Sequence, residues 1–307
     1  MSIIYSTISE TDAGPLFSVI IPAYNCAFFL REALQSLQKQ LCRDFEVIIT
    51  DSCSTDGTDT IAGDFPELPC TVCRITRIGN IGASRNLAVS HAKGRWLAFL
   101  DADDFWCPEK LAVIKSSLST YPDAIAFCHS EYIIKNNNIL NIQHYVSRGN
   151  PLHKSLIFIG NSFSTAATVL RRDIFERVGG FDEDQTMVTA EDYDLWIRAS
   201  RFGKCIFLPD VLGYYRLHGS NSTNKLKQHL DAIEAVLRKH LIGYAASHRW
   251  SIYRRMFRFT VRCAVEMSRH RDWGNALRYG LRAATYGLGM LMSWRPGVAV
   301  CPHDTEL

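Results

Sequence analysis

The sequence predicts an α/β fold whose first half is a Rossmann-like nucleotide-binding sheet, followed by a helical C-terminal extension. Two patterns near the start of the chain predict the sheet. Short apolar runs rich in β-branched residues alternate four times with helical stretches, which is typical of a parallel sheet with right-handed crossovers. Each run also ends in a polar loop, and such loops gather at the sheet edge where open α/β folds bind ligands.

The first half divides into four predicted strands joined by helical stretches. The helix expected after the first strand is amphipathic, with Phe29, Ala33, Leu34 and Leu37 on one face. Gly94 stops the last helix before the fourth strand. The expected strands cover residues 17–22, 45–50, 71–77 and 96–100, and the expected helices cover 28–40, 59–65 and 80–92.

After the fourth strand the regular alternation breaks down. Residues 131–152 are polar, with Asn136, Asn137 and Asn138 in their middle. We expect an irregular loop there, because long loops of this kind are usually functional or mobile. The other expected elements are helices over 108–120 and 172–178, a helix that begins at Glu191, and strands over 124–130, 166–170, 205–208 and 211–216.

The sequence from Lys225 onward is helical and basic, with 14 Lys and Arg against 6 Asp and Glu. Its net charge is therefore +8, whereas residues 1–224 carry −5. Arg254, Arg258 and Arg262 recur every four residues and predict an amphipathic basic helix. Two interpretations stay open, a helical hairpin packed on the α/β domain and a basic surface for an anionic membrane. The expected organisation is an N-terminal tail over 1–15, an α/β domain over 16–224 and a helical region over 225–307.

Composition argues against several classes of protein. Cys70 and Cys73 form a Cys-x-x-Cys pair that no second pair answers, so free thiols in a reducing compartment are favoured over a zinc site. The first 15 residues lack the apolar core of a signal peptide. We expect a cytoplasmic protein, with peripheral attachment to the inner face of the membrane through the helical region. Nucleic acid is not an expected partner, because the body is acidic and the helical region has no recognisable motif.

Three carboxylates directly follow the buried run that ends at Leu100. Asp101 and Asp103 form an Asp-x-Asp pair at the tip of a strand. Such a pair is a typical way to hold a hard divalent cation, which prefers several oxygen ligands at close range. Asp104, which lies just before Pro108, Glu109 and Lys110, is instead expected to cap the helix that follows. Because a helix needs only one N-cap, Asp101 and Asp103 are not expected to share this role.

Five motifs in order resemble those of the family 2 glycosyltransferases. They are residues 17–25 (FSVIIPAYN), 50–58 (TDSCSTDGT), 80–86 (NIGASRN), 101–104 (DADD) and 191–196 (EDYDLW). Residues 179–182 and 215–218 resemble later landmarks of the family, so the resemblance covers about 16–224. It implies a GT-A fold with a mixed sheet and an inverting, hexosyltransferase-type enzyme. The implied partners are a nucleotide-sugar donor, UDP-linked by expectation, and a glycan or lipid-linked glycan acceptor of a surface polysaccharide such as lipopolysaccharide.

The resemblance assigns the donor site to the loops that follow the first four strands. Tyr24 can stack on the base, and Asp51 can accept hydrogen bonds from base or ribose. Arg85 opens a helix and can pair with phosphate through its guanidinium fork. Ser52 and Cys53 stand where many family members carry a second acid and a glycine, which leaves the base selectivity open. The expected donor-binding residues are Pro22, Ala23, Tyr24, Asn25, Asp51, Ser52, Asn80, Arg85, Asp101, Ala102 and Asp103.

A divalent metal, Mn²⁺ or Mg²⁺, is the implied cofactor, because a departing nucleoside diphosphate needs its charge neutralised by a Lewis acid. Asp103 is the expected direct ligand. Asp101 is expected to support the ribose or a water in the outer shell. By itself, His218 would more often be an ordinary loop histidine. By resemblance, it closes the metal site from the far side, which makes the two interpretations about equal.

The acceptor hydroxyl needs a base, because it is a poor nucleophile until its proton is removed. The resemblance assigns this role to Asp192, with Glu191 orienting it or contacting the acceptor. The competing interpretation is that both acids only decorate the first turn of a helix, where the macrodipole favours negative charge. Asp194 is expected to be structural, and Trp196 to lie in the core or against the acceptor sugar.

Two other functions fit parts of the sequence. Ser52 and Cys53 leave open a non-catalytic nucleotide-sugar-binding partner of a membrane-associated glycan assembly. An NAD-dependent dehydrogenase shares the alternating pattern of strands and helices. That enzyme would need a Gly-x-Gly-x-x-Gly motif after the first strand, where residues 22–25 read Pro-Ala-Tyr-Asn instead, so it ranks far below the transferase.

Overall fold

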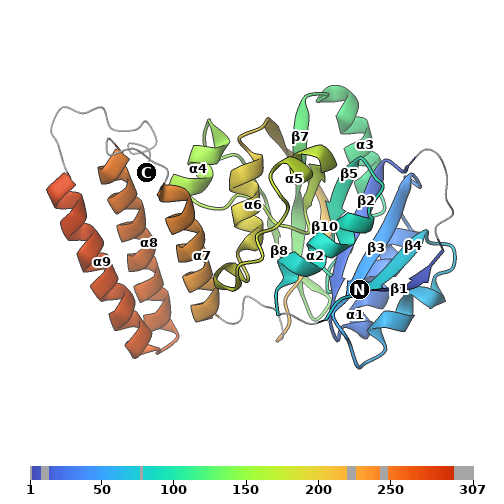
Figure 1. Ribbon diagram of the computed structural model, residues 1–307, viewed down its shortest axis with the longest axis horizontal. Coiled ribbons are helices and arrows are strands. Elements are labelled where there is room, and N and C mark those ends of the chain that lie inside the picture. Colours follow the sequence, from blue (N-terminus) through green and yellow to red (C-terminus); the bar gives the residue numbers. More distant parts are fainter. Residues whose placement is uncertain (1, 8–13, 77–78, 220–225, 243–247, 294–307) are drawn as a thin grey trace.

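The computed structural model describes residues 2–7, 14–76, 79–219, 226–242 and 248–293. Ten strands form one mixed sheet in the order β1-β4-β3-β2-β5-β9-β7-β10-β6, and β8 pairs with β7 beside this path. Three long helices lie side by side beyond one end of the α/β part (Figure 1). The predicted α/β class with a helical C-terminal extension is therefore confirmed.

Four parallel strands form the half of the sheet that was predicted from the apolar runs. They are β2 (Phe17–Ala23), β3 (Phe45–Asp51), β4 (Cys70–Arg74) and β5 (Trp96–Phe99). All residues of β2, β3 and β5 are buried, as expected for parallel strands covered on both faces. The connecting helices are α1 (Ala27–Gln38), the 3₁₀ helix η1 (Thr58–Asp64) and α2 (Ile81–His91).

The second half of the sheet reverses direction at β9 (Thr168–Arg171), which is antiparallel to both β5 and β7 (Ala124–Lys135). Because β9 runs backwards, the loop before it lies at the edge where β5 ends. Strand β10 (Lys204–Arg216) runs parallel to β7 and is one strand, where the sequence suggested two. The other elements are β6 (Phe105–Trp106), α3 (Lys110–Thr120), α4 (Leu152–Phe158), α5 (Arg172–Arg177), η2 (Gln185–Met187) and α6 (Glu191–Ala199).

The irregular loop expected over 131–152 was wrong for its first part. Strand β7 continues to Lys135 and forms a hairpin with β8 (Asn138–Gln143). The turn residues Asn136 and Asn137 have φ angles of 49° and 61°. Asparagine tolerates this left-handed region, which suits tight hairpin turns. Every β8 residue is exposed, including Ile139, Leu140 and Ile142, so this strand lacks the buried apolar run that predicted the others.

An edge strand that was not predicted lies within the expected N-terminal tail. Residues Ser2–Ser6 form β1, which pairs antiparallel with β4. Its register shifts between Ile3 and Tyr5, as expected for a strand with a local irregularity. Residues 8–13 of the predicted tail lie outside the described ranges. So do Arg77, at the end of the predicted third strand, and residues 220–223, near the end of the predicted α/β domain.

The C-terminal helices α7 (Leu226–Leu241), α8 (Arg249–Arg269) and α9 (Trp273–Ser293) form a packed extension of the α/β domain. Side chains from all three belong to the same hydrophobic cluster as α6. Asp194 of α6 is fully buried and holds α7, because His240 and Lys239 both lie within 2.8 Å of its Oδ1. None of the helices in the described ranges is long and apolar enough to cross a bilayer. The nine described cysteines are free thiols, and Cys70 and Cys73 are buried.

Candidate active site

The loop after β2 presents an aromatic ring at the edge of the parallel strands. Pro22 and Ala23 are buried, and the Ala23 carbonyl accepts a hydrogen bond from the Ser52 amide at 3.0 Å. Tyr24 then emerges with 39% of its surface exposed. Asn25 follows with a φ of 45°, and its Oδ1 accepts a hydrogen bond from the Thr55 amide at 2.9 Å. This turn holds Tyr24 at the surface, where the sequence analysis expected a base to stack.

Two further predicted donor residues have local structural roles. Asp51 is fully buried, and both its carboxylate oxygens accept the Ser54 amide at 3.2 Å. Asn80 is the N-cap of α2, and its Oδ1 accepts from the amides of Gly82 and Ala83 at 2.8 and 3.3 Å. The Asn80 Nδ2 is buried without a hydrogen-bond partner in the described part of the chain. Asn80 therefore caps the helix through Oδ1 only, and its Nδ2 group is not used in the cap.

Arg85 joins two acids that are far apart in the sequence. It is 3% exposed, and it donates from Nη2 to Asp101 Oδ1 at 2.6 Å and from Nη1 to Glu191 Oε1 at 2.8 Å. Burial opposes the charge of this group, but Asp101 and Glu191 raise the pKa of Arg85. The partner predicted for Arg85 was a phosphate group. The structure gives the guanidinium two carboxylates, one from each half of the domain.

The two predicted metal ligands meet at the surface of the site. Asp103 Oδ2 lies 2.8 Å from His218 Nε2. The His218 ring stacks on Phe29 of α1, with centroids 4.8 Å apart. Burial raises the pKa of Asp103, Asp101 adds to this effect, and the hydrogen bond from His218 opposes it. The crowding of negative charge in this loop is a condition that a bound cation relieves.

Asp104 does not cap α3, so that prediction was wrong. The residues after it form β6, which pairs with β10 before α3 begins, and Glu109 occupies the N-cap position. Asp104 is instead buried, and its Oδ1 accepts the Arg216 amide at 2.8 Å. Burial, with Asp103 and Asp101 nearby, raises the pKa of Asp104 well above its usual range.

Sequence reasoning missed Arg216, which binds the acidic loop formed by residues 101–104. Its Nε donates to the Asp103 carbonyl at 3.0 Å, its Nη2 to Glu32 at 2.5 Å and its Nη1 to Asn137 at 3.2 Å. These bonds tie the acidic loop to α1, to the β7–β8 turn and to the end of β10. Residues 215–218 resembled a family landmark, but nothing in the sequence placed this arginine beneath Asp103.

The second acid pair begins α6. Glu191 is 3% exposed, and its Oε2 accepts the Thr189 amide at 2.9 Å. Burial raises the pKa of Glu191 to about 7, with Arg85 opposing the shift and Asp192 adding to it. Asp192 is half-buried, and its Oδ2 accepts a hydrogen bond from Thr165 Oγ1 at 2.8 Å. Sequence reasoning missed Thr165, which reaches Asp192 from the loop before the antiparallel strand β9.

The remaining residues of α6 are structural. Asp194 faces α7, and although burial disfavours its charge, His240 and Arg198 keep the pKa of Asp194 below its usual range. Trp196 is buried and stacks on Phe163 with centroids 5.3 Å apart. Both findings agree with the structural role expected for Asp194 and the core position expected for Trp196.

The donor set fits a divalent cation only in part. Among the described residues, no group of three or more His, Cys, Asp and Glu side chains has the arrangement of a metal site. Asp103 and His218 converge as one carboxylate and one imidazole, and Asp101 stands close enough to raise the pKa of Asp103. Such a pair suits an ion that takes its other ligands from substrate and water, as Mg²⁺ usually does.

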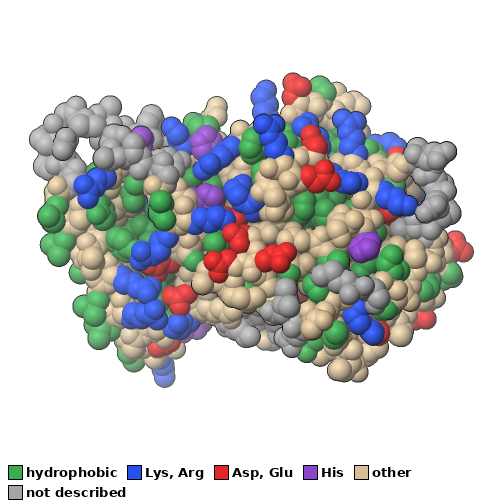
Figure 2. Space-filling view, in the orientation of Figure 1, with side chains coloured by type: hydrophobic (Ala, Val, Ile, Leu, Met, Phe, Trp, Pro, Cys, Tyr) green, Lys and Arg blue, Asp and Glu red, His purple; other side chains and the backbone are tan. Residues whose placement is uncertain are grey.

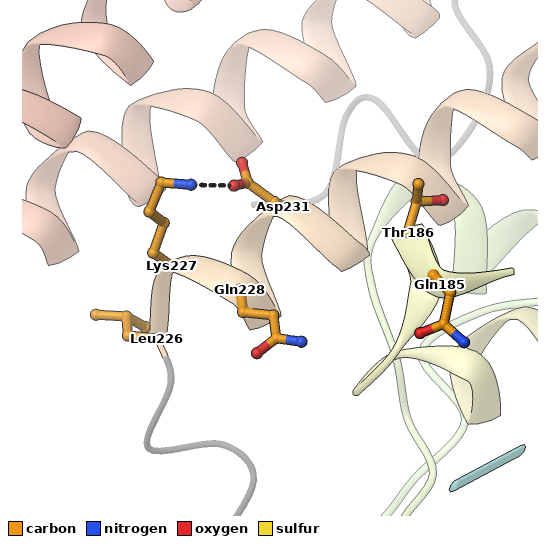
Figure 3. A pocket seen from close by; sticks show the side chains of 6 residues that line it. All are labelled: Gln185, Thr186, Leu226, Lys227, Gln228 and Asp231. Carbon is orange, nitrogen blue, oxygen red and sulfur yellow. Dashed lines mark hydrogen bonds and ion pairs between the residues drawn. The ribbon is translucent and has the colours of Figure 1, made fainter. Parts of the chain in front are cut away.

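A cavity of about 660 Å³ lies between η2 and the first two turns of α7 (Figure 3). The cavity does not include the second acid pair. Elsewhere on α7, His229 lies 3.0 Å from the Thr189 carbonyl, and the Thr189 amide binds Glu191, so α7 contacts the loop that precedes the acid pair. The lining residues of the cavity are Gln185, Thr186, Leu226, Lys227, Gln228 and Asp231.

Comparison with known proteins identifies the family. The family model described as glycosyl transferase family 2 matches residues 18–179, more than half of the chain. The chain belongs to glycosyltransferase family 2. The enzyme class expected from the sequence is thereby confirmed, although the matched span ends before the acid pair on α6.

Other glycosyltransferases agree with this assignment. WfaP of Escherichia coli, named as a UDP-Glc:alpha-D-GlcNAc-diphosphoundecaprenol beta-1,3-glucosyltransferase, is 30% identical over 236 residues, which cover 76% of this chain and 89% of WfaP. Residues 1–349 of S. aureus TarS in complex with UDP-GlcNAc have a TM-score of 0.59 at 18% identity, covering 89% of this chain and 92% of that one. A Pyrobaculum calidifontis mannosyltransferase in complex with GDP-Man and Mn²⁺ has a TM-score of 0.54 at 22% identity, covering 94% and 87%. This family 2 glycosyltransferase shares its fold with both solved structures.

Proposed function

We propose that this family 2 glycosyltransferase moves a sugar, with inversion, from a UDP-sugar to a glycan or lipid-linked glycan acceptor during synthesis of a surface polysaccharide. The observation that carries the proposal is Arg85, which binds Asp101 of the donor half and Glu191 of the acceptor half. The names of two similar proteins support the choice of substrates. WfaP is named for a UDP-Glc donor and a diphosphoundecaprenol acceptor, and TarS was solved with UDP-GlcNAc.

The donor side is assigned to the loops after the parallel strands. Tyr24 is exposed there and offers a face for the base, and the Asn80 amide has a donor that the helix cap leaves unused. Asp103 and His218 are the residues that would hold Mn²⁺ or Mg²⁺. When bound, such a cation supplies positive charge to neutralise the leaving diphosphate. The mannosyltransferase solved with Mn²⁺ supports metal use within this fold.

The acceptor side is assigned to Asp192 as the general base. Its carboxylate removes the proton from the acceptor hydroxyl, and the hydroxyl oxygen attacks the anomeric carbon as the bond to the diphosphate breaks on the opposite face. The Thr165 hydroxyl fixes one carboxylate oxygen at 2.8 Å, which orients the base. Glu191 is held between Arg85 and the Thr189 amide, so it acts as a positioning residue for its neighbour.

The proposed place of action is the cytoplasmic face of the membrane. A lipid-linked acceptor presents its sugar at the bilayer surface, so an enzyme that uses it must work there. The packed basic helices α7 to α9 suit peripheral attachment, because cationic amphipathic helices are attracted to anionic lipids.

The test is sugar transfer by the purified protein with Mn²⁺ or Mg²⁺. Asp192→Asn should lower the transfer rate by about a hundredfold or more, because general-base catalysis contributes about 10²–10⁴-fold. Donor binding by calorimetry should be unchanged. Asp103→Asn should weaken metal-dependent donor binding itself. Asp123→Asn, at an exposed acid outside the site, is the matched control and should behave as wild type. Full transfer by the Asp192→Asn protein would contradict the assignment of the base.

A further inference from the structure

The last helix of the described chain exposes a continuous apolar stripe. Its members are large hydrophobic side chains, each between 63% and 89% exposed. Monomeric soluble proteins rarely expose apolar surface in one contiguous patch, so a row of this length indicates an interaction surface. The α9 stripe consists of Trp273, Leu277, Leu281, Leu288, Leu291 and Met292.

The stripe lies opposite the face by which α9 packs. At about 100° per residue, its six members fall within about 100° of the helix circumference. The buried residues Ala276, Tyr279 and Ala283 lie on the other side and contact the core. In Figure 2, hydrophobic side chains run along the outer edge formed by α9, with Lys and Arg side chains beside them over the neighbouring helices. The stripe therefore lies outside the packed core and faces solvent.

Helix α8 does not offer a comparable surface, although its arginine spacing suggested one. Its apolar residues Met256, Phe259 and Cys263 are buried in the core cluster. Arg255 is also buried, and its Nε donates to the Ile157 carbonyl at 2.8 Å. The exposed residues of α8 are three arginines and two valines, so α8 supplies mainly positive charge while α9 supplies the main apolar contact. They are Arg249, Val261, Arg262, Val265 and Arg269.

The charge around the stripe has one sign. Within the described range 249–292, the exposed residues with a fixed charge are all arginines. The two acids in this range are only partly exposed and have partners, Glu266 with Arg269 at 3.2 Å and Asp272 with Asn275 at 2.8 Å. The exposed arginines are Arg249, Arg262, Arg269, Arg271 and Arg278.

We propose that the α9 stripe docks this enzyme on an anionic lipid bilayer, with α9 lying in the plane of the interface. Trp and Leu side chains insert among the upper acyl chains, and the flanking arginines meet lipid phosphates. A second copy of the chain fits this surface less well, because the exposed fixed charges of residues 249–292 are all positive and offer a second copy no opposite charge, whereas anionic lipid complements them. This inference rests on the peripheral attachment proposed above and deepens it, since it assigns the attachment to one face of α9.

The experiment is vesicle flotation of the full-length protein. Wild type should float with phosphatidylglycerol–phosphatidylethanolamine vesicles and much less with phosphatidylcholine vesicles, and added salt should reduce the bound fraction. Leu277→Glu with Leu281→Glu should lower the bound fraction about tenfold or more. Trp273→Ser with Leu291→Ser, which adds no charge, should also lower it. Leu41→Glu is the matched control, because Leu41 is similarly exposed but lies in the α/β domain, and it should bind as wild type.

Two further measurements separate this proposal from the others. Circular dichroism and thermal melting should show that all variants fold, since every substituted residue is exposed. Transfer to a water-soluble acceptor should be unchanged, so a failure of docking is distinct from a failure of the proposed function. Equal binding to neutral and anionic vesicles, or undiminished binding by both double variants, would overturn the proposal. The proposal would also be overturned if light scattering showed that the wild-type protein is a dimer, the dimer did not bind vesicles, and the Leu277→Glu with Leu281→Glu variant were a monomer.

Discussion

At the scale of residues, the two halves of the site are joined by the buried guanidinium group of Arg85. Arg85 carries an ion pair to Asp101 and another to Glu191, and the side chains of Arg85 and Glu191 are each only 4% exposed. Removing one partner of a buried pair is costly, because the remaining charge is left without compensation in a region of low dielectric. The bonds that Arg85 makes are therefore expected to matter for stability as well as for the alignment of the acids.

A double-mutant cycle can measure this dependence. Arg85→Met should lower the free energy of unfolding by about 3 kcal/mol, because Glu191 loses its counter-charge. Arg85→Met combined with Glu191→Gln should lose less than the sum of the single changes. Urea denaturation of the four proteins provides the measurement. Strictly additive losses would show that the two side chains are not coupled.

The raised pKa of Glu191 makes a second prediction at this scale. Its folded value of about 7 lies above the ordinary value of 4.5, so the folded protein holds this proton more tightly than the unfolded chain does. Glu191 therefore contributes stability that is complete below pH 4.5 and is lost as the pH rises through 7. The difference in unfolding free energy between wild type and Glu191→Gln should change by about 3 kcal/mol across this window. Parallel pH profiles of the two proteins, measured in EDTA, would contradict the assignment.

At the scale of elements, the contrast between predicted and missed strands has a physical cause. The apolar runs of β2, β3 and β5 predicted strands because both faces of a parallel sheet are covered. The exposed strand β8 has no such signal, since its side chains face solvent and its pairing depends on the Asn136–Asn137 turn. Periodicity thus detects the strands that are buried and misses those stabilised mainly by a neighbouring strand.

Helices α6 and α7 are joined by a buried acid, and this link can be tested. The Asp194 side chain is fully buried and lies within 2.8 Å of Arg198, Lys239 and His240. Asp194→Ala should lower the free energy of unfolding by about 3–5 kcal/mol, because Arg198 and His240 lose a buried acceptor, whereas Lys239 keeps its ion pair with Asp182. Thermal and urea unfolding would measure the loss. Asp210→Ala, at an exposed acid of β10, should change stability little, and an equal loss there would remove the special role of Asp194.

At the scale of the whole molecule, the site is assembled from segments that the sequence shows only separately. Asp103 and His218 are 115 residues apart, and Arg85 and Glu191 are 106 apart. Spacing along the chain predicted that acids follow β5 and begin α6, and the family resemblance added His218. No local pattern could predict that Arg85 binds both acids or that Thr165 reaches Asp192, because these contacts depend on how β9 packs beside β5.

Ligand binding to the whole fold offers a test of donor choice. A ligand that binds only the folded state raises its stability, by about 2.7 kcal/mol at a concentration of a hundred times Kd. A UDP-sugar with Mn²⁺ should therefore raise the melting temperature more than a GDP-sugar, and NAD should have no effect. EDTA should remove the shift. A larger shift with GDP-sugars would transfer the donor assignment to the guanine nucleotides.

The reversed direction of β9 has a consequence for how such an enzyme can change its substrate. It brings the loop that carries Thr165 to the edge where β5 ends. The proposed acceptor residues Thr165, Glu191 and Asp192 all fall within residues 165–192, whereas the proposed donor residues come from the first 104 residues together with His218. A recombination event confined to that stretch would exchange the acceptor half and keep the donor half intact. The incoming segment must carry an acid at the position of Glu191, because Arg85 of the retained half binds it. Under the proposed roles, a lineage can acquire new glycan linkages by exchanging one internal segment, with the nucleotide sugar unchanged.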